Sequence, residues 1–178
     1  ISGISSSSDG DVTDVSGGRD YWIIKIDPTG NLIWQKAMGG DGTDVAYSID
    51  ETDDGGAIVA GFSTSTNGDV SGNHGDSDYW IIKLDNSGNY IWQQSLGGSG
   101  TDEPSSIQQT PDGGFIIAGY SYSEDGDLTR NRGSADYWVV KLEEVSTAGT
   151  VYYDADGNCL QDVNENEIAG INLLINPG

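Results

Sequence analysis

Oxygen-bearing side chains recur at short intervals in the segment DADGNCLQDVNE, residues 154–165. They occupy positions 1, 3, 5, 9 and 12 of this twelve-residue window, and the residue at position 7 can contribute its backbone carbonyl. A Ca²⁺ ion takes about six to eight oxygen ligands, and alternate residues of a tightly curled loop can direct such oxygens inward. The spacing therefore predicts a Ca²⁺ site in this loop. Its ligands would be Asp154, Asp156, Asn158, Leu160, Asp162 and Glu165.

The loop departs from the helix-loop-helix version of such a site. Gly157 stands at position 4, and Cys159 occupies position 6, where that version needs a glycine. The flanking segments TVYYD (150–154) and INLLIN (171–176) are typical of strands. We therefore expect a calcium loop on a β scaffold. The alternative that the residues leave open is a turn rich in Asp and Asn whose carboxylates are solvated.

An internal repeat organises the chain that precedes this loop. The octapeptides DYWIIKID, DYWIIKLD and DYWVVKLE begin at residues 20, 78 and 136, so the copies are evenly spaced along the chain without an insertion. One period contains four short β-type segments separated by Gly, Asn and Asp turns, and no segment has helical periodicity. The sequence therefore predicts an all-β fold. The four strands expected in one period cover residues 46–52, 57–63, 79–85 and 90–96.

Four antiparallel strands in a repeat of this length are typical of a β-propeller blade. The sequence contains the second and third strands of one blade, all four strands of the next and the first three strands of a last. This makes roughly two and a half blades, whereas closed propellers have about 4–8. We therefore expect N-terminal blades and a closing strand to lie outside this sequence, with pairing of partial blades between chains as the rival possibility. A parallel β-solenoid is the competing repeat fold, but its coils need fewer residues and no hairpin turns.

Aspartates recur in register in the acidic loops between the second and third strands. A structural turn needs the same residue in every blade, whereas a site built once for catalysis would not recur three times. We therefore expect these carboxylates to accept hydrogen bonds from turn N–H groups, and metal binding in the same loops is the less favoured alternative. The two recurring sets are Asp11, Asp69 and Asp127, and Asp20, Asp78 and Asp136.

A lysine recurs within the third strand of each repeat, among Ile, Val and Leu. A lysine in an apolar strand is usually ion-paired or extends its ammonium group to solvent. The predicted partners are aspartates that recur in the same register. The lysines are Lys25, Lys83 and Lys141, and the candidate partners are Asp20, Asp78, Asp136, Asp44 and Asp102.

The balance of charge excludes several classes of partner. Seven Lys and Arg against 29 Asp and Glu give a net charge of −22, which disfavours both nucleic-acid phosphates and anionic lipid surfaces. No apolar stretch approaches the ~20 residues needed to span a bilayer, so membrane insertion is not expected. No Ser/His/Asp order, Cys/His pair, phosphate loop or CxxC motif occurs, so no catalytic residue is predicted.

Two resemblances add to this interpretation. Residues 1–143, with the segments DYWIIKLD, GGDGTD and DGGAIVAG, resemble the repeats of exported Bacteroidota proteins that form β-propeller-like arrays and often carry type IX secretion sorting domains. The tail, with GTVYYD, ADGNCLQDVNENE and IAGINLLI, resembles the start of an SdrD B-like (Cna-B-like) domain, an Ig- or prealbumin-like β-sandwich. The resemblances imply propeller repeats over residues 1–145 and the start of the β module over residues 146–178.

These observations lead us to expect a non-enzymatic extracellular or cell-surface protein, acting in adhesion or as a scaffold or binding module with a Ca²⁺-stabilised Ig-like extension. Its expected partners are protein or glycan ligands at the cell surface, or other chains and modules of the same assembly. Identical blades give a rigid presenting surface, and variable loops supply specificity. The alternative is a carbohydrate-binding or hydrolytic propeller enzyme whose active centre lies in blades outside this chain.

Overall fold

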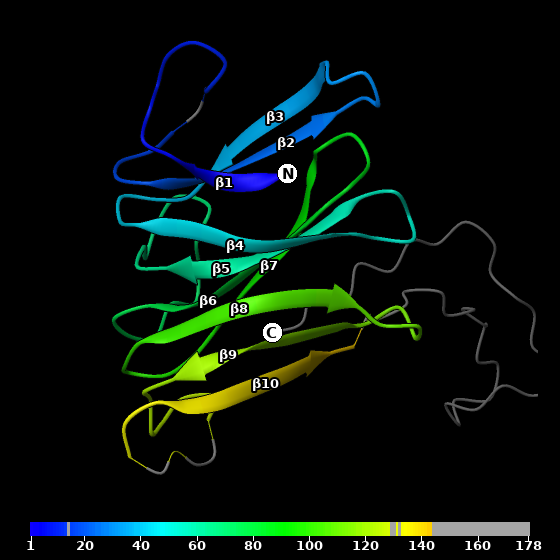
Figure 1. The fold of residues 1–178 in the computed structure, drawn as a ribbon. Helices are drawn as coiled ribbons and strands as arrows, with labels where there is room; N and C mark the ends of the chain where they lie inside the picture. Colours follow the sequence, from blue (N-terminus) through cyan, green and yellow to red (C-terminus); the bar gives the residue numbers. More distant parts are fainter. Residues whose placement is uncertain (14, 129–130, 132, 144–178) are drawn as a thin grey trace, which may run out of the picture. The chain divides into compact units, whose positions relative to one another are not determined.

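The computed structural model describes residues 1–13, 15–128, 131 and 133–143. Every regular element in that part of the chain is a β-strand, so the all-β prediction is confirmed there. Figure 1 shows these strands as three sheets that follow one another in chain order. The predicted β module of residues 146–178 lies outside the described residues.

The three sheets are antiparallel and open. Sheet 1 has the order β1-β2-β3, with β1 (Ser2–Ser5), β2 (Asp20–Ile26) and β3 (Leu32–Met38). Sheet 2 has the order β4-β5-β6-β7, with β4 (Asp44–Glu51), β5 (Ala57–Ser63), β6 (Asp78–Leu84) and β7 (Tyr90–Leu96). Sheet 3 has the order β10-β9-β8, with β8 (Asp102–Gln109), β9 (Phe115–Ser121) and β10 (Asp136–Leu142).

Sheet 2 has the four antiparallel strands expected for one repeat, and β5 and β7 have the predicted bounds. The count of two strands in the first sheet was wrong, because β3 pairs with β2 from Tyr21↔Met38 to Ile26↔Leu32. β3 lies one full repeat before β7 and is its equivalent. Comparison of the two repeats therefore indicates this third strand of sheet 1. The antiparallel pairing of all three sheets also excludes a parallel solenoid for the described residues.

Asp and Gly build the turn that joins the last two strands of sheet 2. The Asp85 carboxylate accepts hydrogen bonds from the backbone N–H groups of Ser87 and Asn89, both at 2.8 Å. Gly88 has a φ of 79°, in the region that residues with a Cβ rarely adopt. The same turn recurs in sheet 1, where Asp27 accepts from the N–H groups of its own turn. The repeat thus fixes its hairpins through local side-chain hydrogen bonds.

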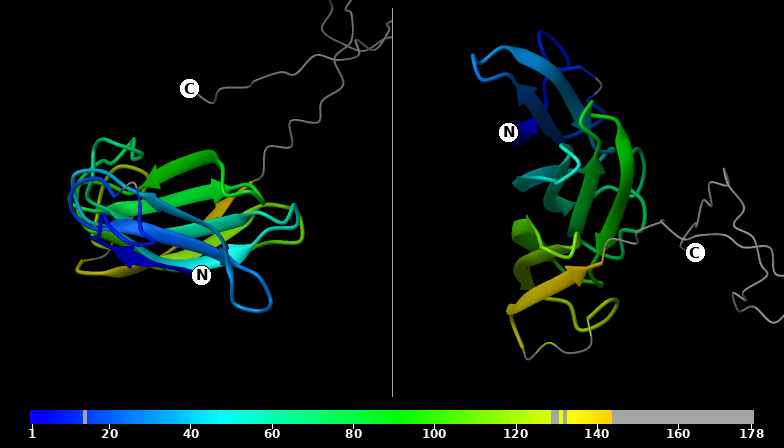
Figure 2. Two further views of the ribbon diagram at one scale, coloured as in Figure 1. Left: turned by 90° about the horizontal axis from the view of Figure 1, so that it is seen from above. Right: turned by 90° about the vertical axis from the view of Figure 1, so that its right-hand side faces the viewer.

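Apolar side chains fill the space between successive sheets. Figure 2 shows the ribbon of these sheets from two further directions. We call the contact of sheets 1 and 2 the first interface and that of sheets 2 and 3 the second interface. The first interface buries Tyr21, Ile23, Met38, Ala46, Val59, Val70, Trp80, Ile82 and Leu84. The second interface buries Ile58, Ala60, Tyr79, Ile81, Leu96, Ile107, Phe115 and Ile117.

One tyrosine contact marks both interfaces. The Tyr21 hydroxyl donates to the Trp80 carbonyl oxygen at 2.9 Å, and the Tyr79 hydroxyl donates to the Trp138 carbonyl oxygen at 3.2 Å. Each tyrosine ring also packs on the ring of the same tryptophan, with centroids 4.5 and 4.6 Å apart. The burial of large aromatic rings with satisfied hydroxyl groups stabilises each contact. Successive sheets are therefore joined by a repeated, equivalent interaction.

Candidate functional site

The predicted calcium ligands lie outside the described residues. They are Asp154, Asp156, Asn158, Leu160, Asp162 and Glu165.

Four of the six recurring aspartates, namely Asp20, Asp78, Asp69 and Asp127, accept hydrogen bonds from backbone N–H groups, as predicted. Asp20 Oδ2 accepts from the Ser16 N–H at 2.6 Å, and Asp78 Oδ2 accepts from the His74 N–H at 2.7 Å. Asp69 and Asp127 reach the adjoining Gly-Gly loop. Asp69 accepts from the Gly39 N–H at 3.2 Å and Asp127 from the Gly97 N–H at 3.1 Å.

A second buried carboxylate faces Asp20 and Asp78 across a glycine: Asp44 across Gly39, and Asp102 across Gly97. A Cβ placed on Gly97 would lie 2.5 Å from Asp78 Oδ1 and 2.6 Å from Asp102 Oδ2, so only glycine fits between the two carboxylates. Burial raises the pKa of Asp78, and repulsion from Asp102 raises it further. Burial likewise raises the pKa of Asp20 in the equivalent site of sheet 1. These loops are therefore built around carboxylates that are costly to ionise.

The predicted lysine partners were wrong. Lys83 Nζ lies 2.8 Å from Asp54 Oδ2, and Lys141 Nζ lies 2.7 Å from Asp112 Oδ1. Both aspartates belong to the turn that joins the first two strands of the same sheet. Asp78 stands five residues before Lys83 on β6, or roughly 16 Å along an extended strand, at its other end. The ion pairs therefore serve the hairpin turns.

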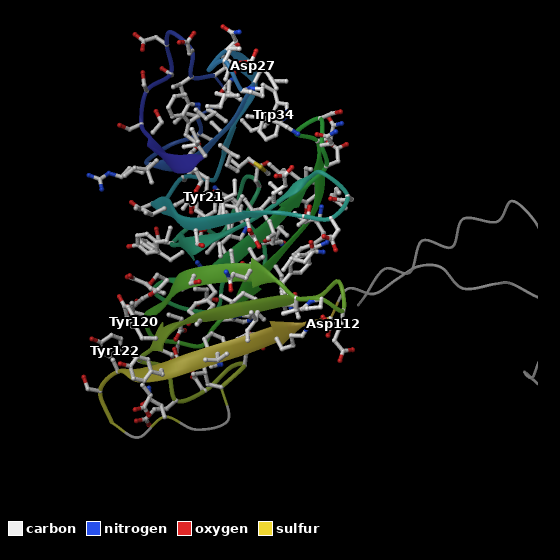
Figure 3. All side chains as sticks on the ribbon, turned by 45° about the vertical axis from the view of Figure 1, so that its right-hand side comes forward. Tyr21, Asp27, Trp34, Asp112, Tyr120 and Tyr122 are labelled. Atoms are coloured by element: carbon white, nitrogen blue, oxygen red, sulfur yellow. The ribbon has the colours of Figure 1, made fainter. Side chains whose placement is uncertain are left out.

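Aromatic side chains and one carboxylate form a continuous surface on sheets 2 and 3. We call it the aromatic surface, and it consists of Tyr47, Phe62, Glu103, Tyr120 and Tyr122. The Tyr47 ring packs on Phe62 with centroids 5.8 Å apart, and the Tyr120 ring meets Tyr122 edge to face at 5.9 Å. Glu103 connects the two pairs. Figure 3 shows Tyr120 and Tyr122 close together at the end of the strands remote from Asp112.

The Glu103 carboxylate organises the two phenols beside it. Its Oε2 accepts from the Tyr120 hydroxyl at 2.7 Å and lies 3.5 Å from the Tyr47 hydroxyl, at the limit of a hydrogen bond. The hydrogen bond to Glu103 raises the pKa of Tyr120 to about 12. Desolvation and Glu103 also raise the pKa of Tyr47. Both phenols therefore remain protonated donors at neutral pH.

A β-bulge exposes Tyr47. The pairing of β4 with β5 shifts between Ala46 and Ser48, so Tyr47 is the extra residue on β4. A bulge can re-aim a side chain out of the regular alternation of a strand. Tyr47 is 50% exposed, and Tyr122, which follows β9, is 48% exposed. Two aromatic rings therefore face solvent on either side of the Glu103 carboxylate.

Sequence reasoning missed the aromatic surface, although the repeat contained a signal for it. Positions one repeat apart are mostly alike in structural segments, but they differ here. Where equivalent positions of a repeat carry different residues, one sheet can acquire a chemistry that the neighbouring sheets lack. The differing pairs are Val45 and Glu103, Tyr47 and Ser105, Phe62 and Tyr120, and Thr64 and Tyr122.

A scan against protein-family models finds no match for this chain, and a search of curated proteins finds none either. Over residues 1–13, 15–128, 131 and 133–143, no three His, Cys, Asp or Glu side chains are grouped so that they could hold a metal ion. In the same part of the chain, no helix is long and apolar enough to cross a membrane.

Proposed function

We propose that the chain is a non-enzymatic binding module that works outside the cell or at its surface, and that its aromatic surface binds a glycan. The observation that carries this proposal is the chain of contacts from Phe62 through Tyr47, Glu103 and Tyr120 to Tyr122. Sugar rings offer C–H groups to aromatic faces and hydroxyl groups to a carboxylate. The surface supplies both types of partner within two adjacent sheets.

The charge of the chain narrows the class of glycan. A net charge of −22 repels sulfated and sialylated sugars, and the carboxylate at the centre of the surface adds to this repulsion. Glu103 also accepts hydrogen bonds and donates none in its ionised form. We therefore expect neutral or amino sugars to bind.

The test is a glycan array followed by calorimetric titration of the best neutral or amino glycan. Tyr122→Ala should weaken binding by about tenfold, because one stacked aromatic ring contributes roughly that much. The matched control is Tyr90→Ala, because Tyr90 is similarly exposed, at 53%, but lies at the other end of sheet 2. Glu103→Gln should also weaken binding, because it removes the charge while keeping the side-chain size.

Three outcomes would contradict the proposal. They are the absence of binding to neutral and amino glycans, equal affinity of the Tyr122→Ala and wild-type chains, and equal losses in the Tyr122→Ala and Tyr90→Ala variants. Turnover of a bound glycan by the purified chain would replace the proposal with the enzymatic alternative.

We also propose that the sheets are blades of a β-propeller. Support comes from the four antiparallel strands of sheet 2 and from the equivalent tyrosine contacts at both interfaces. If the same contact joins each pair of successive sheets, each sheet is related to the next by the same rotation, as blades are in a propeller.

The tail contributes a separate proposal, a Ca²⁺ site formed by residues 154–165. Its support is the oxygen spacing in the sequence. Calorimetric titration of the full chain with Ca²⁺ should show binding that Asp154→Ala and Glu165→Ala weaken. Unchanged affinity in both variants would contradict the site. This result would leave the glycan proposal unaffected.

A further inference from the structure

The aromatic surface carries a negative charge that no cation of the described part of the chain neutralises. Glu103 is partly exposed, and its Oε2 atom accepts from the Tyr120 hydroxyl at 2.7 Å and lies 3.5 Å from the Tyr47 hydroxyl. Within residues 1–13, 15–128, 131 and 133–143, no lysine, arginine or histidine forms an ion pair with this carboxylate. Its other oxygen, Oε1, is therefore available to a ligand.

The aromatic rings beside this carboxylate favour a ligand of the same charge as the carboxylate does. Tyr47 and Tyr122 are each about half exposed, and Tyr122 meets the ring of Tyr120, which donates to Glu103. The face of an aromatic ring is the negative part of its quadrupole, so it attracts a cation. The carboxylate and the ring faces therefore both favour a positively charged group.

This combination is not a requirement of the repeat fold. The residues of sheet 2 that are equivalent to Glu103 and Tyr122 are Val45 and Thr64. Sheet 2 thus has neither the charged acceptor nor the aromatic ring at these positions, and it still forms its four strands. The two side chains are therefore free to serve a ligand.

A neutral ligand would use only part of this surface. A sugar hydroxyl group can donate an ordinary hydrogen bond to Glu103, whereas an ammonium group donates a charge-assisted bond that is roughly twice as strong. The ammonium group is also attracted to a neighbouring ring face, which a hydroxyl group is not to the same extent. An ammonium group therefore fits the surface better than a neutral substituent of similar size.

We propose that the aromatic surface selects an amino sugar, with the ammonium group of the sugar bound to Glu103 Oε1 and the sugar ring stacked on Tyr122. This assignment rests on the proposed glycan function and narrows it to one class of ligand. The C–H groups of the sugar ring pack on the aromatic face, while the ammonium group donates to the carboxylate. An N-acetylated sugar keeps the ring but has no charge, so it should bind as a neutral sugar does.

The overall charge of the chain has to be separated from the effect of this carboxylate. A net charge of −22 attracts every cationic ligand. In about 0.15 M NaCl, exposed charges more than about 8 Å apart are largely screened from each other. Under this condition the preference for an ammonium group should depend on Glu103 and not on distant carboxylates.

Calorimetric titration of the full chain in about 0.15 M NaCl tests the selection. The ligands are disaccharides of glucose, N-acetylglucosamine and glucosamine with one common linkage, so they differ only in a hydroxyl, an acetamido or an ammonium group. The glucosamine disaccharide should bind about tenfold more tightly than the glucose disaccharide, because it adds a charge-assisted bond and a cation–π contact. The N-acetylglucosamine disaccharide should bind within about threefold of the glucose disaccharide.

Two variants that remove the same charge locate the origin of this preference. Glu103→Gln should reduce the preference from about tenfold to about twofold or less, because the amide lacks the charge. The matched control is Glu51→Gln, because Glu51 is exposed and stands four residues beyond Tyr47 on β4, roughly 13 Å along an extended strand. The control should keep the tenfold preference. Both variants should keep the circular dichroism spectrum of the wild-type chain.

A simple ammonium ion tests whether the sugar ring contributes. Tetramethylammonium carries the charge without a ring to stack on Tyr122, so it should bind at least about tenfold more weakly than the glucosamine disaccharide. Equal affinity for the two ligands would overturn the assignment to an amino sugar. It would assign the surface to an ammonium group from another source, such as a methylated lysine of a protein.

Other results would also overturn the selection of an amino sugar. They are equal affinity for the glucose and glucosamine disaccharides, a preference that Glu103→Gln leaves unchanged, and equal losses of the preference in the Glu103→Gln and Glu51→Gln chains. If the glucose disaccharide still binds and Tyr122→Ala weakens it, these results leave the proposed function intact. The absence of binding to all three disaccharides would contradict the proposed function and the selection together.

Discussion

The two interfaces use equivalent residues but are filled to different extents. At the second interface, Phe115 is 1% exposed and packs against Trp92 with ring centroids 5.9 Å apart. At the first interface, Ala57 stands at the equivalent position, and a cleft of about 320 Å³ lies beside it and Trp34. One side chain therefore decides whether the same strand pattern gives a closed interface or a hollow one.

The lysines of the two interfaces differ in a similar way. Lys83 has a side chain only 3% exposed, and it contacts Asp54 and Thr52 of its own sheet. Lys25 instead donates to the carbonyl oxygen of Gly55 in the next sheet, at 3.3 Å. The lysine of sheet 2 is thus ion-paired within its own sheet, whereas the lysine of sheet 1 connects two sheets at the edge of the cleft. The comparison shows that a repeated sequence position need not keep a repeated partner.

The largest expected effect comes from emptying the filled interface. Phe115→Ala should lower the free energy of unfolding by about 3–4 kcal/mol, because it removes a fully buried aromatic ring and leaves a cavity beside Trp92. Chemical denaturation of the two chains measures the difference. A loss below about 1 kcal/mol would show that the second interface does not depend on this ring.

Filling the cleft at the first interface should stabilise the chain. Ala57→Phe places there the residue that position 115 carries at the second interface. It should raise the free energy of unfolding by about 1–2 kcal/mol. The same denaturation experiment measures it. A destabilised variant would mean that the cleft cannot accept the ring without strain, and that the two interfaces differ in backbone spacing as well as in side chains.

The lysine pairs predict a pH-dependent difference. The hydrogen bond from Lys83 lowers the pKa of Asp54 to about 2. A carboxyl group with a lowered folded-state pKa stabilises the fold above its unfolded value of about 3.9, and this contribution is lost as the pH falls toward 2. Asp54→Asn should therefore destabilise the chain at pH 7 by about 1 kcal/mol, since Asp54 is half exposed and screened by solvent.

Thermal unfolding between pH 2 and pH 7 checks this expectation. The difference between Asp54→Asn and the wild-type chain should shrink below about pH 4. Lys25→Met is the matched comparison, because Lys25 contacts oxygens of Gly55 and Asn86 that do not titrate. A pH-independent cost of Asp54→Asn would contradict the role of the ion pair.

The smallest expected effect concerns the buried carboxylates. Because the folded-state pKa of Asp78 is raised, its ionisation costs stability, and this cost grows as the pH rises through the folded pKa. Asp78→Asn places an amide nitrogen where Oδ1 faces Asp102 across Gly97, so it should stabilise the chain at pH 7 by up to about 1 kcal/mol. This gain in stability should vanish near pH 3, where the Asp78 carboxyl group of the wild-type chain is protonated in both the folded and the unfolded state.

A melting temperature of Asp78→Asn below that of the wild-type chain at pH 7 would contradict this account. Asp78→Ala serves as the control. It removes the oxygen that accepts from the His74 N–H, so it should destabilise the chain at every pH.

Much of the fold could be predicted from the sequence because the repeat fixes local structure. Strand positions, the Asp-Gly turns and the capping by Asp20 and Asp78 depend on residues close in the chain, and the alternation of side chains reports them directly. The lysine partners could not be predicted in this way. Asp54 and Lys83 lie far apart in the sequence, and only the pairing of β4 to β6 through β5 brings them together.

The candidate site depended even more on tertiary structure. Glu103 and Tyr47 come from different sheets, and the exposure of Tyr47 follows from a bulge that has no signature of its own in the sequence. The exposure of Tyr137 was equally hidden, because the corresponding strand of sheet 2, β6, is buried along its whole length. The two strands differ because sheet 3 covers β6, whereas no described sheet covers the equivalent face of β10. The sequence of a strand does not indicate whether another sheet packs on it.

The most direct test of the proposed function maps the glycan onto the tyrosine rings. A ¹H–¹³C spectrum of the chain labelled at tyrosine rings, recorded with increasing amounts of the best neutral or amino glycan from the array, reports each ring separately. The account predicts that the Tyr47, Tyr120 and Tyr122 signals shift together with one affinity, while Tyr90 and Tyr137 stay unchanged. Shifts confined to Tyr90 or Tyr137, or no shift of the three rings at a saturating glycan concentration, would contradict it.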